Sequence, residues 1–281
     1  MLKSAPRAFA ALLLAFSAAA FAQAQPAGKS QEYTPSVGQE GKDVIWVPTP
    51  NELIAKMLDM AKVTPSDFVV DLGSGDGRTV IAAAKRGAKA LGIEYNPDMV
   101  ELSKKSAQKE GVTGKANFVR GDIFETDFTG ATVVTMYLLP NLNLKLRPKL
   151  LDMKPGTRLV SHAFTMDDWK PDQTATADGR TAYLWIVPDK VEGTWQVQAG
   201  GQTYTVTLSQ KFQELSGSAK AGGKDLALRD GKLDGENIAF VIDAGGAPRE
   251  FRGRVSGNSM NGMSRAGSTE SAWTATRSAA R

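Results

Sequence analysis

The chain has 281 residues, 42% of them hydrophobic, which is enough for one large domain or two ordinary ones with a buried core. Its 34 basic and 30 acidic residues leave a net charge of +4, and no basic patch with interleaved aromatic residues occurs, which argues against a nucleic-acid partner. The sequence has no cysteine, which excludes disulfides, thiolate chemistry and lipid attachment through an N-terminal cysteine.

Residues 1–24 have the pattern of a secretory signal peptide. Lys3 and Arg7 precede an apolar run over residues 8–22, and small residues mark cleavage positions after Ala22 and Ala24. The run is short for a membrane span. We therefore expect cleavage, no stable membrane span in the mature protein, and a periplasmic or secreted location, which suits a chain without cysteine.

Residues 25–43 are polar and contain glycine and proline, so they are predicted to form a mobile leader. A helix is expected next, at the lip of a cleft. Thr49, Pro50 and Glu52 fit the N-cap, N1 and N3 positions of a capping box, and apolar residues recur at helical spacing up to Ala61. Trp46, just before this helix, is interpreted as a packing residue in preference to a ligand contact.

Residues 68–85 have the layout of a nucleotide cradle, in which a strand leads through a glycine turn into a helix. Such glycines let the backbone approach a ligand, and the helix N-terminus offers free N–H groups to an anion. The glycines are spaced as G-x-G-x-G, not as the dinucleotide fingerprint G-x-G-x-x-G, and Asp71 lies two residues ahead of them. A carboxylate there is unfavourable beside a pyrophosphate but suits an ammonium group. S-adenosyl-L-methionine offers an ammonium group, a carboxylate and no phosphate.

The next two predicted strands also end in acids. Residues 90–94 end in Glu94, about twenty residues beyond the glycine turn, where a ribose-binding carboxylate belongs in a βαβ unit. Residues 116–120 are followed by Asp122, which can accept a hydrogen bond from an adenine amino group. Three acids at three strand ends, together with the glycines, resemble the class I S-adenosylmethionine-dependent methyltransferases. The alternatives are a βαβ domain for another ligand and a relic that no longer binds.

The remaining elements up to residue 188 alternate between strand and helix. They are a helix over 97–110, a strand over 131–138, a helix from 141 that Pro148 interrupts or bends, a strand over 158–164, a polar loop over 165–180 and a strand over 182–187. This alternation predicts a mostly parallel sheet covered on both faces, an α/β Rossmann-like fold.

Beyond Pro188 the pattern changes to period-two alternation punctuated by glycine pairs, as at Gly200-Gly201 and Gly222-Gly223. We predict a small all-β domain, an antiparallel meander of six to eight strands over residues 191–276 that curls into a barrel or sandwich. A stabilising or docking appendage is favoured over a ligand-binding or partner-binding barrel.

Methyl transfer from a sulfonium requires alignment of donor and acceptor in a dry pocket and no metal. With one histidine and no Asp/Glu cluster at ligand spacing, we predict no metal site. The acceptor pocket is expected at the end of the fourth strand, where Tyr137 and Asn141 would act as catalytic residues by receiving an amine. For His162, a structural hydrogen-bonded role is favoured over a general base.

Residues 47–50, 71–85, 92–97 and Pro140 resemble the mitochondrial ATP synthase c-subunit lysine methyltransferase family, and more distantly the non-SET histone lysine methyltransferase. The resemblance covers about residues 44–188. It implies S-adenosyl-L-methionine as the cofactor and a lysine of a protein as the acceptor. It also implies a set of cofactor-binding residues: Gly73, Gly75 and Glu94, with Asp71 and Asp122 as helpers. Gly77, the third glycine of the turn, is also predicted to bind the cofactor. The export signal is a departure from these relatives, which work where the cofactor is made.

The sequence therefore predicts a signal peptide (1–24), a mobile leader (25–43), a class I methyltransferase domain (44–188) and an antiparallel β-meander domain (189–281). The predicted function is methyl transfer to a protein lysine. Two alternatives from other classes stay open. One is an exported nucleoside-binding protein that keeps the methyltransferase fold without catalysis, and the other is a partner-binding protein whose function lies in the β-meander.

Overall fold

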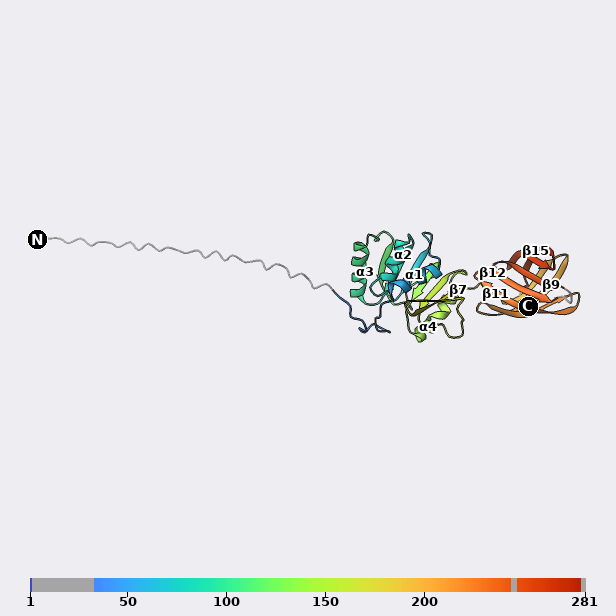
Figure 1. Cartoon of the computed structure of the whole chain (residues 1–281), viewed down its shortest axis with the longest axis horizontal. Helices are drawn as coiled ribbons and strands as arrows, with labels where there is room; N and C mark the ends of the chain where they lie inside the picture. The colour runs from blue at the N-terminus through green and yellow to red at the C-terminus, as the bar shows by residue number, and fades with distance from the viewer. Residues whose placement is uncertain (2–32, 244–246, 279–281) are drawn as a thin grey trace. The chain divides into compact units, whose positions relative to one another are not determined.

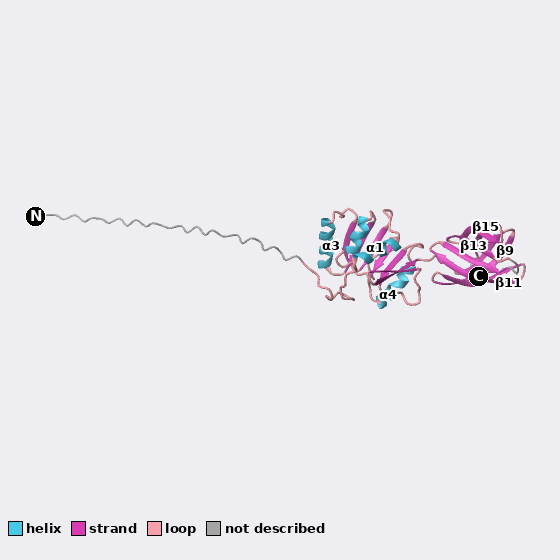
Figure 2. Cartoon of the chain, in the orientation of Figure 1, coloured by secondary structure: helices cyan, strands magenta, loops and turns pink. Residues whose placement is uncertain are grey.

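The structure is a computed structural model that describes Met1, residues 33–243 and residues 247–278. The predicted signal peptide therefore lies, except for Met1, outside the described residues. The described chain from Pro35 onward forms one unit with two parts, a sheet covered by helices and a barrel of strands, which Figures 1 and 2 show.

The mostly parallel sheet predicted for the first part is confirmed. Among the described residues it has seven strands in the order β3-β2-β1-β4-β5-β7-β6. The strands are β1 (Phe68–Leu72), β2 (Lys89–Glu94), β3 (Ala116–Arg120), β4 (Val133–Met136), β5 (Arg158–His162), β6 (Gln173–Ala177) and β7 (Arg180–Ile186). Strands β1 to β5 are parallel, whereas β7 pairs antiparallel with β5, and β6 with β7.

Strand β6 corrects one prediction, since it lies within the stretch expected to be a polar loop over residues 165–180. Its sequence, Gln-Thr-Ala-Thr-Ala, has no large apolar side chain, and it is half exposed along its length. It forms because the turn at Asp178–Gly179, where both residues have positive φ, folds it back onto β7 at the sheet edge. A strand that buries so little apolar surface leaves no hydrophobic alternation to detect.

Helices cover both faces of the sheet because successive strand residues point to opposite sides. Val69, Val133 and Val160 belong to one core cluster, whereas their chain neighbours Val70, Val134 and Leu159 belong to another. The first face is covered by α1 (Asn51–Met60), α2 (Arg78–Lys85) and α3 (Pro97–Lys109), and the second by α4 (Pro140–Leu151). Helix α4 continues through Pro148, so the predicted interruption there does not occur.

The helix starts are only partly as predicted. Asn96 caps α3 by accepting from the N–H of Asp98 (2.9 Å), and Pro97 follows it at N1, as expected. The capping box of α1 is wrong, since the N-cap of α1 is Pro50 and no side chain caps that helix. The hydroxyl that would form the cap, that of Thr49, contacts His162 at the end of β5 instead.

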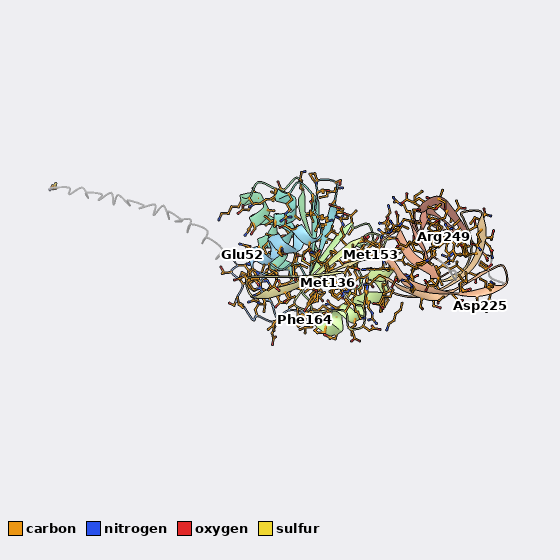
Figure 3. The ribbon with its side chains drawn as sticks, turned by 45° about the vertical axis from the view of Figure 1, so that its right-hand side comes forward. Glu52, Met136, Met153, Phe164, Asp225 and Arg249 are labelled. Atoms are coloured by element: carbon orange, nitrogen blue, oxygen red, sulfur yellow. The ribbon has the colours of Figure 1, made fainter. Side chains whose placement is uncertain are left out.

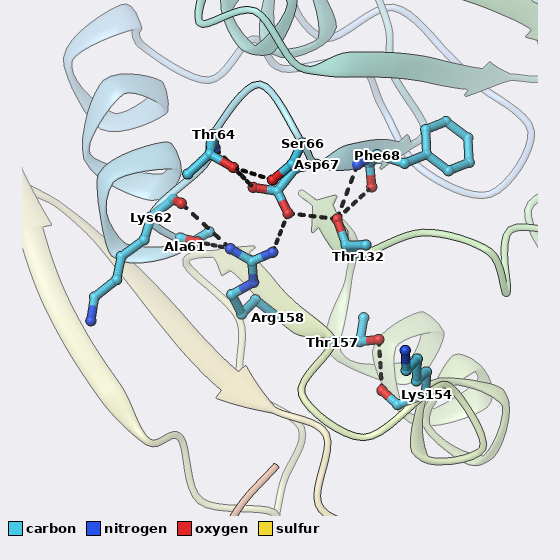
Figure 4. A network of polar contacts seen from close by, with 10 residues as sticks. All are labelled: Ala61, Lys62, Thr64, Ser66, Asp67, Phe68, Thr132, Lys154, Thr157 and Arg158. Carbon is cyan, nitrogen blue, oxygen red and sulfur yellow. Dashed lines mark hydrogen bonds and ion pairs between the residues drawn. The ribbon is translucent and has the colours of Figure 1, made fainter. Parts of the chain in front are cut away.

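A polar network ties the amino ends of the strands together, on the edge opposite the predicted cofactor site (Figure 4). The Asp67 carboxylate accepts from the hydroxyl of Thr132 (2.7 Å) and the N–H of Thr64 (2.8 Å), and it pairs with Arg158. Burial would raise the pKa of Asp67, but these partners hold it below its usual value. Arg158 also donates to the carbonyl of Ala61 (2.6 Å) at the end of α1, so the network joins β1, β4, β5 and α1.

The all-β prediction for the second part is confirmed as a closed barrel. In the described part of residues 189–278, eight antiparallel strands close in the order β10-β11-β12-β13-β14-β15-β8-β9. They are β8 (Gly193–Ala199), β9 (Gln202–Lys211), β10 (Glu214–Ala221), β11 (Lys224–Asp234), β12 (Asn237–Asp243), β13 (Arg249–Ser256), β14 (Ser259–Ala266) and β15 (Thr269–Arg277). The interior is a packed core of aromatic and aliphatic side chains in which Phe240 stacks on Phe251 (4.6 Å between centroids) and Trp273 meets both rings edge-on.

The turn between β9 and β10 contacts the segment that follows β5. Phe212 stacks on Trp169 with ring centroids 5.6 Å apart, and the indole N–H of Trp169 donates to Gln213 (3.0 Å). Phe212 and Gln213 thus link the barrel to the first part of the unit, and the barrel has a separate hydrophobic core.

Candidate functional site

A cavity of about 730 Å³ opens at the carboxyl ends of β1 to β4. The chain runs from β1 outward through β2 and β3 and then returns to place β4 on the other side of β1. Ligands of open α/β sheets bind at such a change of direction. The cavity is lined by residues 39–49, Met57, Asp71, 73–76, Arg78, Thr79, 94–96, Met99, 121–123, 136–139, Leu142 and Phe164. Met136 and Phe164 are labelled in Figure 3.

The glycine turn after β1 forms the floor of the cavity. Gly73 and Gly75 have φ values of +75° and +54°, in the left-handed region that favours glycine, and Gly73 donates its N–H to the carbonyl of Ile93 (2.9 Å). A Cβ atom on Gly75 would lie 2.6 Å from the indole nitrogen of Trp46, which packs directly over it. Both glycines therefore bring bare backbone to the cavity surface.

Glu94 is held by the backbone at the end of β2. Its two carboxylate oxygens accept hydrogen bonds from the N–H groups of Gly75 and Asn96, both at 2.9 Å. These bonds fix the carboxylate at the cavity wall and link β2 to the glycine turn. Each oxygen keeps a further lone pair, which is what recognition of two ribose hydroxyls requires.

Asp71 lies at the bottom of the cavity and is buried, with 7% of its surface exposed. It accepts a hydrogen bond from the hydroxyl of Thr135 on β4 (2.6 Å). Burial is the main cause that raises the pKa of Asp71 to about 7; the nearby carboxylates of Glu94 and Asp76 contribute to this rise, and the hydrogen bonds from Thr135 and Thr79 oppose it. A cationic ligand group would offset the cost of burying the negative charge of this carboxylate.

Asp122 follows β3 and contacts two donors. The N–H of Phe124 donates to one oxygen (2.9 Å), and the ammonium group of Lys42 pairs with the other. The hydrogen bond from Lys42 is the main cause that lowers the pKa of Asp122, so this carboxylate is ionised. Lys42 also lies 5.2 Å from the centre of the Tyr95 ring.

The segment that brings Lys42 to this position lies in the stretch predicted as a mobile leader. In the structure, Gly38 and Gln39 pair with Trp46, and Glu40 forms a bridge with Ile45. Residues 38–46 thus form a short hairpin, here called the N-terminal hairpin. Its residues from Gln39 onward line the cavity, a role that the leader prediction missed.

Aromatic residues form the wall at the end of β4. The Tyr137 ring packs against His162 with centroids 3.7 Å apart and the ring planes tilted by 30°, and it stacks on Phe164 with centroids 6.1 Å apart. His162 is completely buried, and its Nδ1 lies 3.0 Å from the hydroxyl of Thr49. Burial, with a smaller effect of Arg180, lowers the pKa of His162 to about 4, so the ring is neutral near pH 7. This agrees with the predicted structural role for His162.

Six of the eight predicted site residues line the cavity: Asp71, Gly73, Gly75, Glu94, Asp122 and Tyr137. The other two, Gly77 and Asn141, do not. A Cβ on Gly77 would meet Phe118 (2.7 Å) and Ser103 (2.8 Å), so this glycine serves close helix packing. Asn141 is exposed on the first turn of α4, whereas Asn143 points into the core and donates to the carbonyl of Thr165 (3.2 Å).

Other cavity residues were not predicted as site residues. Lys42 and Trp46 come from the N-terminal hairpin, and Tyr95 follows Glu94. Asp76 and Arg78 pair at 2.6 Å beside the glycine turn, and Arg78 also reaches the carbonyl of Thr49 (3.3 Å). The Asp76–Arg78 pair could have been predicted, because Arg78 directly follows the glycine motif. The role of the N-terminal hairpin could not, because residues 38–46 contain no recognisable motif.

The residues present fit S-adenosyl-L-methionine. The buried hydroxyl of Ser74, in the glycine turn, has no hydrogen-bond partner among the described residues, and Asp71 lacks a cationic partner there. Glu94 and Asp122 would hold the ribose and adenine, and Asp71 and the glycine turn the methionine part. In the described part of the chain, no group of three His, Asp or Glu residues is arranged to hold a metal ion.

Comparisons with known proteins agree with this geometry. A family model of the ANTKMT methyltransferase domain matches residues 71–173, and a DNA methylase model matches residues 31–105. A solved RNA methyltransferase from Salinibacter ruber, in complex with S-adenosyl-L-homocysteine, is 48% identical with a TM-score of 0.50. It is matched over 52% of this chain and 96% of that one. The cofactor is therefore S-adenosyl-L-methionine.

Two curated relatives are similar to this chain, and one of them is matched over nearly its whole length. The lysine N-methyltransferase of the ATP synthase c-subunit from Rattus norvegicus is 40% identical over 40% of this chain and 51% of its own length, so the chain spans about half of this relative. The protein-lysine N-methyltransferase of Saccharolobus islandicus is 44% identical over 51% of this chain and 94% of its own length. The cavity residues lie within the matched sheet part, and the chain belongs to the family of protein-lysine N-methyltransferases as an S-adenosyl-L-methionine-dependent enzyme.

Proposed function

We propose that this methyltransferase transfers a methyl group to the ε-amino group of a lysine in another protein, and that it does so outside the cytoplasm. The observation that carries the proposal is the 44% identity to the Saccharolobus enzyme over nearly its whole length. The wall around Tyr137 and Phe164 supports it, since an aromatic surface suits the apolar stem and amine of a lysine.

The chemistry requires an uncharged amine, because an ammonium group has no lone pair to attack with. Bound S-adenosyl-L-methionine supplies an electrophilic methyl group on its sulfonium. The chain's own task is to bind the lysine stem, exclude water and keep the amine deprotonated. A wall of Tyr137, Leu138 and Phe164 does this by desolvation, which lowers the pKa of a lysine amine from about 10.4. Packing against His162 holds Tyr137 in place.

The location outside the cytoplasm rests on the sequence. Residues 1–24 carry the signal-peptide pattern, and the chain has no cysteine. Among the described residues, no helix is both long and apolar enough to cross a membrane. The mature protein is thus proposed to be free in the periplasm or secreted.

Methyl-labelled cofactor tests the acceptor. The mature protein, residues 25–281, is incubated with labelled S-adenosyl-L-methionine and a periplasmic extract. The proposal expects label in protein, recovered as methyl-lysine after hydrolysis, and rates that rise with pH and level off below about 10.4, at the lowered pKa of the bound amine. The Glu94→Ala variant is the control and should leave the extract unlabelled. Label that ribonuclease removes would identify RNA as the acceptor and contradict the proposal.

Fractionation tests the location. The full chain and a chain without residues 2–24 are expressed and followed by mass spectrometry in periplasm and cytoplasm. The full chain should appear in the periplasm, shortened by 22 or 24 residues, and the shortened chain in the cytoplasm. A full chain that stays unprocessed in the cytoplasm would refute the exported location.

A further inference from the structure

The N-terminal hairpin, residues 38–46, precedes the first helix and lines the cavity from Gln39 onward. Its strands are joined by hydrogen bonds of 2.9 Å between Gly38 and Trp46 and between Trp46 and Gln39. The hairpin tip brings Lys42 to Asp122, a residue 80 positions further along the chain. The base of the hairpin brings Trp46 to Gly75. One segment thus contacts both the residue that follows β3 and the glycine turn after β1.

The contacts of the tip are electrostatic and partly shielded. The side chain of Lys42 is 35% exposed and that of Asp122 only 16%. Lys42 lies over the ring of Tyr95, and Asp43 also faces it at 3.5 Å. The hydrogen bond to Asp122 raises the pKa of Lys42, so the pair stays ionised on both sides. The hairpin is therefore fastened at the acid expected beside the adenine.

The contact at the base of the hairpin is van der Waals packing between Trp46 and the backbone of Gly75. Trp46 occupies the space where a side chain on Gly75 would lie, so the indole closes over the glycine turn. The other four tryptophans, Trp169, Trp185, Trp195 and Trp273, are at most 1% exposed and do not line the cavity. Trp46 is thus the one tryptophan of the described residues that lines this cavity.

We propose that the N-terminal hairpin is a clasp for the cofactor, in which Lys42 is a positioning residue that fastens the hairpin to Asp122 and so sets how fast the cofactor leaves. Trp46 closes the methionine side, and Lys42 closes the adenine side. In this proposal the tip opens for the cofactor to enter and leave, since the hairpin lines the cavity and its tip is held by the pair of Lys42 with Asp122. The proposal rests on the cofactor alone and is independent of the acceptor.

Stopped-flow fluorescence of Trp46 measures the clasp directly. Binding of S-adenosyl-L-homocysteine, the demethylated product form, is expected to change the tryptophan signal, and the Trp46→Phe variant should lose this change. In Lys42→Met, the dissociation rate should rise about three- to tenfold, between the effect of an exposed ion pair and that of a charged hydrogen bond. Lys42→Arg keeps the charge and should restore a nearly normal rate.

Two controls separate the clasp from general effects. Lys85 forms a more exposed surface pair with Glu110 (2.6 Å), and neither residue lines the cavity, so Lys85→Met should leave the dissociation rate unchanged. In an Asp122→Asn background, Lys42→Met should add little, because the partner of the ammonium group has lost its charge. The melting temperature without cofactor should be the same in Lys42→Met and Lys85→Met within about 2 °C.

The proposal fails if the Lys42→Met dissociation rate equals that of the unmodified protein, or if Lys85→Met accelerates it as much. It also fails if Lys42→Met has its full effect in the Asp122→Asn background, since the two residues would then act independently. A large fall in melting temperature with an unchanged dissociation rate would give Lys42 a structural role only.

Discussion

Replacing Glu94 with alanine is expected to weaken cofactor binding more than any other single change at the strand ends. The carboxylate accepts from Gly75 and Asn96 at 2.9 Å and offers its remaining lone pairs to the ribose. Hydrogen bonds to a charged group contribute about 1.5–3 kcal/mol each. Losing the equivalent of one such bond at the ribose corresponds to a weakening of about tenfold to a few hundredfold.

Calorimetric titration of the folded variant with S-adenosyl-L-methionine measures this loss. Two backbone donors also lose their acceptor, so the melting temperature without cofactor should fall by a few degrees, at about 2–4 °C per kcal/mol for a domain of this size. Asp67→Asn is the matched control, because it weakens the pair with Arg158 at the opposite end of the strands. That variant should lose stability and keep its affinity within about twofold. A folded Glu94→Ala protein with an unchanged dissociation constant would refute the ribose assignment.

Four further outcomes are expected. Gly75→Ala places a Cβ 2.6 Å from Trp46 at a φ of +54°, so the rise in melting temperature that the cofactor causes should disappear; a variant that keeps this rise would contradict the cradle. Cofactor affinity should increase as pH rises through about 7, the pKa of Asp71, because only the ionised carboxylate attracts an ammonium group, and calorimetry should show this dependence lost in Asp71→Asn. The raised pKa of Asp71 also makes the cofactor-free fold less stable as pH rises from about 4 to about 7, because the folded state retains a proton that the unfolded chain has released. The melting temperatures of the unmodified protein and Asp71→Asn should therefore diverge over this pH range. Residues 189–281 alone should give strand-type circular dichroism and a cooperative melt, whereas a non-cooperative melt would mean that the barrel depends on the Phe212–Trp169 contact.

The strand-end acids could be predicted from the sequence because they follow from local rules. Asp71, Glu94 and Asp122 each come at the end of a recognisable strand, and parallel strands present their carboxyl ends at one edge. All three line the cavity. The period-two pattern after Pro188 likewise predicted the β-meander, since a barrel with a filled interior must alternate inward and outward residues.

The remaining features depend on contacts between distant parts of the chain. Lys42 lies at the cavity next to Asp122, 80 positions further along the chain. The hydroxyl of Thr49 does not cap its own helix and instead forms a hydrogen bond with His162, 113 positions away. Gly77 shows a different limit. A glycine that serves backbone approach and one that serves close packing look alike in sequence, and only the positions of Phe118 and Ser103 distinguish them.

The buried ring of His162 bears on how the kinetics of this enzyme can be interpreted. Because its pKa is about 4, the support behind Tyr137 does not change charge above about pH 5. Asp71 titrates near pH 7 but acts on the cofactor, and its effect vanishes once the cofactor is saturating. Turnover measured at saturating cofactor from pH 7.5 upward would then follow the ionisation of the acceptor amine itself. A rate profile of this kind reports the pKa of an amine inside the pocket without any label on the acceptor.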